Sequence, residues 1–202
     1  MRNPLIITIG REYGSGGRQI GELVAKTLGI AYYDKKLITL AAQKSGLSDE
    51  FIANNEQRVR NGFMQNLAAS AAYSSGFFSS QYLPLSESIF ISEAQVIRDI
   101  AAKESAVIVG RCADYILRDR KDCLHVFICS DMASRARRIV ERYGQTQKAP
   151  EKRLAEKDQK RKVYYKNYTG RVWGQAQNYD ICLNSDALGV DTCADMIVQL
   201  CK

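Results

Sequence analysis

Histidine, proline and tryptophan are scarce in this chain, which has one, three and one of them in 202 residues. A lone histidine, His125, and six cysteines without a C-x-x-C pair leave little material for a zinc site. No apolar run approaches the roughly 18 residues of a membrane-spanning helix, and the first residues lack the apolar stretch of a secretory signal. We therefore expect a cytoplasmic protein with reduced thiols and no membrane partner.

Acidic residues are outnumbered, since 29 Lys and Arg stand against 22 Asp and Glu. The formal net charge of +7 and the pI of about 9.1 imply anionic partners, which include nucleotides, nucleic acid, acidic lipids and phosphorylated metabolites. The sequence contains no recognised nucleic-acid-binding module, so nucleic acid is the less favoured partner. The length fits a single domain with a proper core.

Short β-branched or apolar runs alternate with segments of helical periodicity along the chain. The runs predict strands at residues 5–9, 30–33, 106–109, 124–128 and 179–183. Helical segments are expected at 20–28, 89–103 and 191–200. One further helix should end near Gly46 and another should precede residue 124, and two basic helices should lie between the last two strands. This alternation predicts a parallel five-stranded sheet with helices on both faces, a three-layer α/β/α fold.

Two segments differ from this alternating pattern. Residues 61–88 are rich in Ala, Ser, Tyr, Phe and Gly with weak periodicity, and we expect a mobile excursion there. Residues 135–171 are basic, and their cations recur at helical spacing in two stripes, which are Arg135, Arg138 and Arg142, and Arg153, Lys157 and Arg161. Such stripes indicate either a solvated helix surface or a surface for anionic phosphates.

A glycine-rich turn follows the first predicted strand and opens the first helix, which is the context of a phosphate-binding loop. Its candidate phosphate-binding residues are Gly10, Gly14, Ser15, Gly16, Gly17, Arg18 and Gln19. The consensus G-x-x-x-x-G-K-[ST] has a lysine after the glycines, and this loop has none. Either Arg18 supplies the cation or the backbone amides act alone, while a tight turn of purely structural purpose is the remaining alternative.

Several phrases of the chain resemble the cytidylate-kinase-like family, bacterial relatives of cytidylate kinase. They cover most of the chain and are Thr8-Ile9-Gly10-Arg11-Glu12-Tyr13-Gly14-Ser15-Gly16-Gly17-Arg18, Tyr33-Asp34, Val107-Ile108-Val109-Gly110-Arg111, Tyr164-Tyr165-Lys166-Asn167-Tyr168-Thr169-Gly170 and Tyr179-Asp180. The resemblance implies a P-loop kinase fold, phosphoryl transfer from ATP with Mg²⁺, and a pyrimidine monophosphate, CMP or dCMP, or a related small phosphorylated acceptor. It also implies that residues 135–171 form a lid over the phosphates and that residues 61–88 lie on the acceptor side.

The resemblance also implies roles for particular residues. Arg18, placed at the lysine of the loop, would act in catalysis with Arg138 and Arg161, and the lid would present Arg153, Lys157 and Arg161. The acceptor would meet Asp34, Lys36, Arg111 and Asp114. For Mg²⁺ the loop offers Ser15 and Gln19 as candidates only.

The chain departs from the family pattern in ways that leave two functions open. The arginine expected six residues after Asp34 is replaced by Leu40, and the lid phrase loses its second acid. One hypothesis is an ATP-dependent nucleotide kinase. The other is a nucleotide-binding protein that has lost transfer activity and acts as a sensor or partner, which the missing loop lysine favours.

Overall fold

The computed structural model describes residues 5–34 and 85–201. For residues 85–88 it describes the backbone alone. The chain divides into two units, one of Met1–Asp34 with Ile97–Lys202 and one of Lys35–Val96. In the second unit, the described residues form the first part of helix α4 (Leu85–Lys103). The predicted helix ending near Gly46, residues 61–84 of the predicted excursion, and Lys36 lie outside the described residues.

The larger unit contains a five-stranded sheet in which every pairing is parallel. The strands are β1 (Ile6–Arg11), β2 (Ala31–Tyr33), β3 (Ala106–Val109), β4 (Cys123–Cys129) and β5 (Ile181–Asn184). Their spatial order is β2-β3-β1-β4-β5, so β1 lies at the centre between β3 and β4. This confirms the predicted α/β class, and the order is typical of P-loop kinases of the nucleoside-monophosphate type.

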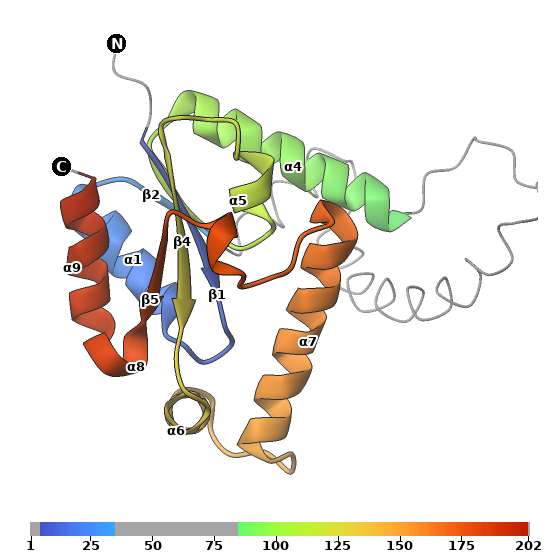
Figure 1. Ribbon diagram of the computed structural model, residues 1–202, viewed down its shortest axis with the longest axis vertical. Helices are drawn as coiled ribbons and strands as arrows, with labels where there is room; N and C mark the ends of the chain where they lie inside the picture. Colours follow the sequence, from blue (N-terminus) through green and yellow to red (C-terminus); the bar gives the residue numbers. More distant parts are fainter. Residues whose placement is uncertain (1–4, 35–84, 202) are drawn as a thin grey trace, which may run out of the picture. The chain divides into compact units, whose positions relative to one another are not determined.

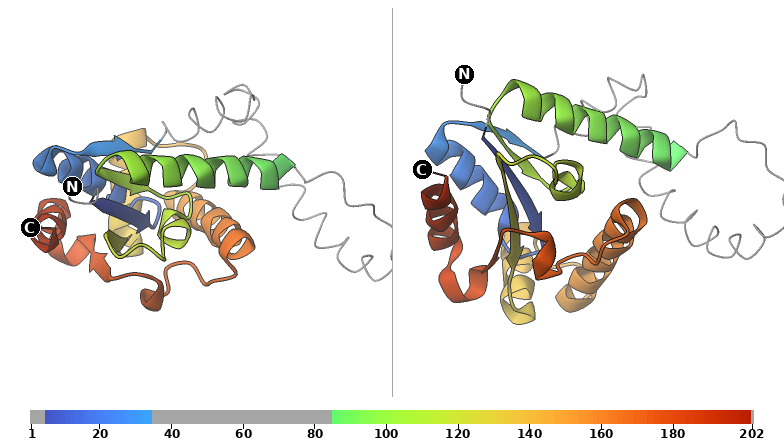
Figure 2. Two further views of the ribbon diagram at one scale, coloured as in Figure 1. Left: turned by 90° about the horizontal axis from the view of Figure 1, so that it is seen from above. Right: turned by 45° about the horizontal axis from the view of Figure 1, so that its top comes forward.

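Helices α1 (Gly17–Leu28) and α9 (Val190–Leu200) pack against each other on one side of the sheet (Figures 1 and 2). Alternate strand residues such as Ile7 and Val109 join Val24 and Ile197 of these helices in one buried cluster. In α1 the buried residues recur at helical spacing because one face meets the sheet: Gly17, Ile20, Gly21, Val24 and Ala25. The central strands are buried on both faces, which explains their continuous apolar sequences.

Helix α7 (Pro150–Thr169) lies on the opposite side of the strands from α9, and α6 (Met132–Tyr143) lies beyond the carboxyl end of β4 (Figure 1). Asp131 caps α6, because its carboxylate accepts hydrogen bonds from the backbone N–H groups of Ala133 and Ser134. Pro150 begins α7, and Gly170 ends it in the left-handed conformation. The other short helices of the described residues are α5 (Ala113–Ile116), η1 (Ala176–Asn178) and α8 (Ser185–Leu188).

The structure moves several predicted boundaries. Strand β1 continues through Gly10 to Arg11, because Gly10 and Arg11 pair with Phe127 and Ile128 of β4, so Gly10 belongs to the sheet. The helix predicted before the fourth strand is only the four residues of α5, and α4 begins four residues earlier than expected. Among the described helices, none has the length and apolar character needed to cross a membrane.

The buried face of α9 generates a stability prediction. Ile197 is completely buried in the core cluster, whereas its neighbour Met196 is 39 % exposed. Ile197→Ala should lower the free energy of unfolding by about 2–5 kcal/mol, because it removes buried methyl groups and leaves a cavity. The matched Met196→Ala should change it by less than about 0.5 kcal/mol. Urea denaturation followed by circular dichroism measures both, and equal losses would contradict this packing.

Candidate functional site

The loop between β1 and α1 has the backbone geometry of an anion-binding turn. Gly14 and Gly16 adopt φ values of +82° and +81°, which residues with side chains rarely adopt. At Gly14 a side chain would also lie 3.0 Å from the carbonyl oxygen of Arg135 in α6. Gly16 is the N-cap of α1, and the first turn of this helix contains no acidic residue. No carboxylate of the first turn therefore neutralises the positive end of the helix dipole, which favours binding of an anion there.

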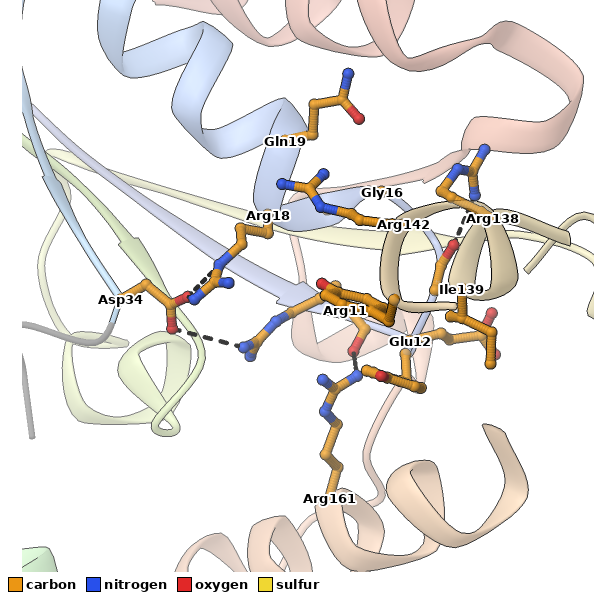
Figure 3. Close-up of a pocket in the computed structure, with 14 residues that line it drawn as sticks. Arg11, Glu12, Gly16, Arg18, Gln19, Asp34, Arg138, Ile139, Arg142 and Arg161 are labelled. Carbon is orange, nitrogen blue, oxygen red and sulfur yellow. Dashed lines mark hydrogen bonds and ion pairs between the residues drawn. The ribbon is translucent and has the colours of Figure 1, made fainter. Parts of the chain in front are cut away.

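A cavity of about 220 Å³ opens beside this loop, at the carboxyl ends of the strands. Five arginines and two carboxylates line it, and they are Arg11, Arg18, Arg138, Arg142, Arg161, Glu12 and Asp34. The other lining residues are Tyr13, Gly14, Gly16, Gly17, Gln19, Ile139 and Tyr143. Figure 3 shows arginines from β1, α1, α6 and α7 converging on this space. The excess of cations predicts a polyanionic ligand.

Asp34, which follows β2, pairs with two of these arginines (Figure 3). Its Oδ2 accepts a hydrogen bond from Nε of Arg18 at 2.6 Å, and its Oδ1 lies 4.0 Å from a terminal nitrogen of Arg11. Burial and the neighbouring Arg161 lower the pKa of Arg11 to about 9, while Asp34 opposes this shift. Arg11 therefore stays protonated at neutral pH, and an anion bound beside it would stabilise its positive charge.

Two further arginines bond directly to the backbone of the loop and of the last residue of β1. Arg138 of α6 donates to the carbonyl oxygen of Gly14 at 2.6 Å, and Arg161 of α7 donates to that of Arg11 at 3.0 Å. Each guanidinium has more donors than these bonds use. The bonds therefore hold both groups at the cavity wall while leaving N–H groups for a ligand.

A buried carboxylate, Asp158 of α7, joins the loop to both basic helices. It accepts hydrogen bonds from the backbone N–H of Tyr13 at 2.7 Å and from Arg135 of α6 at 2.5 Å, and it lies 3.5 Å from Arg161. Arg135 also lies 3.6 Å from Glu12, whose carboxylate accepts the backbone N–H of Ser130. This network fixes the loop against α6 and α7.

The comparisons with known proteins agree with this geometry. A model of the cytidylate kinase-like family matches residues 6–187. The chain belongs to this family. No curated protein sequence matches the chain.

Solved structures extend the comparison. The chain is 30 % identical to an uncharacterized protein from Eubacterium ventriosum, with a TM-score of 0.72 and 98 % of both chains covered. A shikimate kinase from Acinetobacter baumannii is 15 % identical, with a TM-score of 0.54 and coverage of 98 % of this chain and 92 % of that one. A gluconokinase from Sinorhizobium meliloti is 14 % identical, with a TM-score of 0.53 and coverage of 100 % and 95 %. The last two show a shared fold.

In this member of the family, the structure brings many of the residues singled out from the sequence to one cavity. They are Gly14, Gly16, Gly17, Arg18, Gln19, Asp34, Arg138 and Arg161. Gly10 and Ser15 do not line it. Gly10 packs under Phe127 and Tyr179, and Ser15 is buried with its hydroxyl donating to the carbonyl oxygen of Glu12 at 2.9 Å.

The other candidates among the described residues do not line this cavity. Asp114 is buried and accepts a hydrogen bond from Tyr165 of α7 at 2.6 Å, and burial raises its pKa. Arg111 follows β3 in a turn where it has a φ of +56°, an uncommon conformation for a residue with a side chain. Arg153 donates to the carbonyl oxygen of Gly144, and Lys157 is exposed. His125 of β4 bonds to Thr8 of the neighbouring strand β1 at 2.8 Å, so this contact lies within the sheet.

The two basic stripes therefore have divided roles. Arg135 is buried in the ion pair with Asp158, while Arg138 and Arg142 of the same stripe line the cavity. Sequence reasoning did not single out Arg11, Tyr13, Tyr143 or Asp158 for the site. For Arg11 and Tyr13 a signal existed, because both lie inside the glycine-rich phrase. Among the described residues, no cluster of three or more His, Cys, Asp or Glu side chains could hold a metal ion.

The Arg135 ion pair generates a second stability prediction. Both side chains are nearly buried, with exposed fractions of 8 % for Arg135 and 10 % for Asp158. Arg135→Ala should destabilise the protein by about 3–5 kcal/mol, because it leaves the Asp158 charge buried without its main partner. The control is Arg137→Ala on the exposed side of α6, for which we expect about 0.5 kcal/mol or less. Thermal or urea unfolding tests this, and similar stabilities of the two variants would refute it.

Proposed function

We propose that this protein transfers the γ-phosphoryl group of ATP to a nucleoside monophosphate, with CMP, dCMP or a related small phosphorylated compound as the acceptor. The observation that carries the proposal is the convergence of five arginines on the glycine-rich loop. Membership of the cytidylate kinase-like family supports it. Because ATP and nucleoside monophosphates are cytoplasmic metabolites, the proposal includes a cytoplasmic location.

The arginines of the cavity support phosphoryl transfer as its chemistry. An oxygen of the acceptor phosphate attacks the γ-phosphorus, the bond from that phosphorus to the β,γ-bridging oxygen breaks, and ADP leaves with the bonding electron pair. Charge spreads over the γ-phosphoryl oxygens in the transition state, so positioned cations accelerate the step. Arg138 and Arg161, held by the loop backbone, are the candidates for this role, and Arg18 is the third.

The other ligands have candidate positions around the same loop. The amides from Gly14 to Arg18 would bind the phosphates of ATP at the start of α1. Asp34 and Arg111, at the carboxyl ends of β2 and β3, are proposed to meet the acceptor together with Lys36 and Asp114. Residues 135–171 would cover ATP as a lid and exclude water from the reaction.

Mg²⁺ would neutralise the phosphates of ATP and would be bound chiefly by phosphate oxygens, as is usual at such sites. Glu12 and Asp34 are the two carboxylates in the cavity lining. Ser15 fits a metal ligand less well, because its hydroxyl already donates to the carbonyl oxygen of Glu12. Gln19 lies at the cavity with an exposed side chain.

A second candidate function is nucleotide binding without transfer, as in a sensor or partner protein. The ion pair between Arg18 and Asp34 favours it, because the cation nearest to the position of the missing lysine is held by an internal carboxylate. In this function the cavity would bind ATP, and no phosphoryl group would leave it.

An ADP-release assay separates the two functions. With ATP and Mg²⁺, ADP production should rise on addition of one monophosphate from a panel of CMP, dCMP, UMP and AMP, and be slow without an acceptor. Calorimetry on the same preparation reports whether ATP binds. Binding of ATP without ADP release for any acceptor would select the non-catalytic function, and absence of ATP binding would reject both.

The position of Arg161 generates a kinetic prediction. Arg161→Ala should lower kcat by about 10-fold or more, because it removes a cation that acts on the transition state, and should leave ATP affinity nearly unchanged. The control is Lys162→Ala, an exposed cation at the next position of α7, which should retain the original kcat. Steady-state kinetics at saturating ATP measures both. Full activity of Arg161→Ala would return this arginine to a structural role.

A further inference from the structure

Two tyrosine rings stand nearly parallel at the wall of the arginine-lined cavity. The planes of Tyr13, in the loop, and Tyr143, the last residue of α6, differ by 12°, and their centroids are 6.3 Å apart. A flat ring that lies between two others needs van der Waals contact on both faces, which corresponds to a spacing of about 7 Å. The planes of the two rings can be no farther apart than their centroids, which are 6.3 Å apart, so one tyrosine must move outward before a planar group can enter between them.

Tyr143 can make such a shift. Its exposed fraction is 50 %, and the helix ends directly after it at Gly144, which has a φ of +72°. Tyr13 is held more firmly, because its backbone N–H is bonded to Asp158 and the guanidinium of Arg161 lies 5.5 Å from its ring centroid. The pair thus combines one fixed ring with one that borders solvent.

The surroundings of the pair indicate what it would hold. Both tyrosines line the same cavity as the five arginines. A ligand with a planar group between the two rings could therefore place an attached anionic group beside the glycine-rich loop. A nucleotide has both parts, an aromatic base and a phosphate chain. Aromatic side chains bind bases through stacking, which every base permits.

We propose that Tyr13 and Tyr143 form a stacking site for the base of ATP, which enters between the two rings while its phosphates contact the loop and the arginines. The inference rests on the proposed binding of ATP in this cavity. Tyr143 is the ring that moves, and Tyr13 is the platform. The binding energy comes from stacking of the base on the ring face, so the phenolic hydroxyl of Tyr143 is not required.

The test compares ATP with inorganic tripolyphosphate, which has the phosphate chain and no base. Isothermal titration calorimetry is carried out on the full chain and on Tyr143→Leu, Tyr143→Phe and Met132→Ala. Met132→Ala is the control, because Met132 lies on the first turn of α6, is similarly exposed at 48 %, and does not line the cavity. Thermal unfolding checks that each variant is folded, and the ADP-release assay is run in parallel.

Tyr143→Leu should weaken ATP binding by about 5- to 100-fold and leave tripolyphosphate binding unchanged, while Tyr143→Phe and Met132→Ala should bind both ligands as the original protein does. Unchanged ATP affinity in Tyr143→Leu, or an equal loss for ATP and tripolyphosphate, would overturn the stacking site. So would an original protein that binds neither ligand. A protein that binds ATP with this pattern and releases no ADP would support the stacking site and reject the kinase, so the two failures are distinguishable.

Discussion

The carboxylate of Asp158 organises the whole site. It is buried at the meeting point of the loop, α6 and α7, and each of these three elements contributes a donor or a cation to it. A charge in such a position is stable only while its partners surround it. The loop conformation and the positions of the two basic helices are therefore coupled. Arg138 and Arg161 reach the cavity from helices whose placement depends on this one group.

Burial also explains why, within one basic helix, some arginines form buried ion pairs and others line the cavity. A helix that packs along one side must place some of its cations inward, and an inward cation requires a carboxylate. In α6 Arg135 takes this position and meets Asp158, while Arg138, about one turn later, lies at the cavity. The apolar contact of Ala136 and Ile139 with Leu154 and Tyr13 fixes the rotation of the helix that produces this division.

The sequence allowed the fold to be predicted further than the site. Parallel strands and their helices have periodic apolar patterns, so all five strands were predicted with ends displaced by at most two residues. The loop residues that line the cavity were predicted because a glycine-rich turn between a strand and a helix has a local signature. Asp158 and Tyr143 carry no such signature, since their roles depend on contacts with residues more than a hundred positions away. The ion pair of Arg18 with Asp34 likewise joins the first turn of α1 to the residue that follows β2, and the folded sheet brings these two positions together.

The ion pair between Arg18 and Asp34 makes ligand capture an exchange of partners. A phosphate that approaches Arg18 competes with a carboxylate already in contact with it, so the net gain is the difference between two charge-assisted interactions rather than the full value of one. The same carboxylate is ready to take the guanidinium back when the phosphate departs. In the proposed function, this internal competitor would therefore favour release of the ligand over permanent occupancy of the cavity.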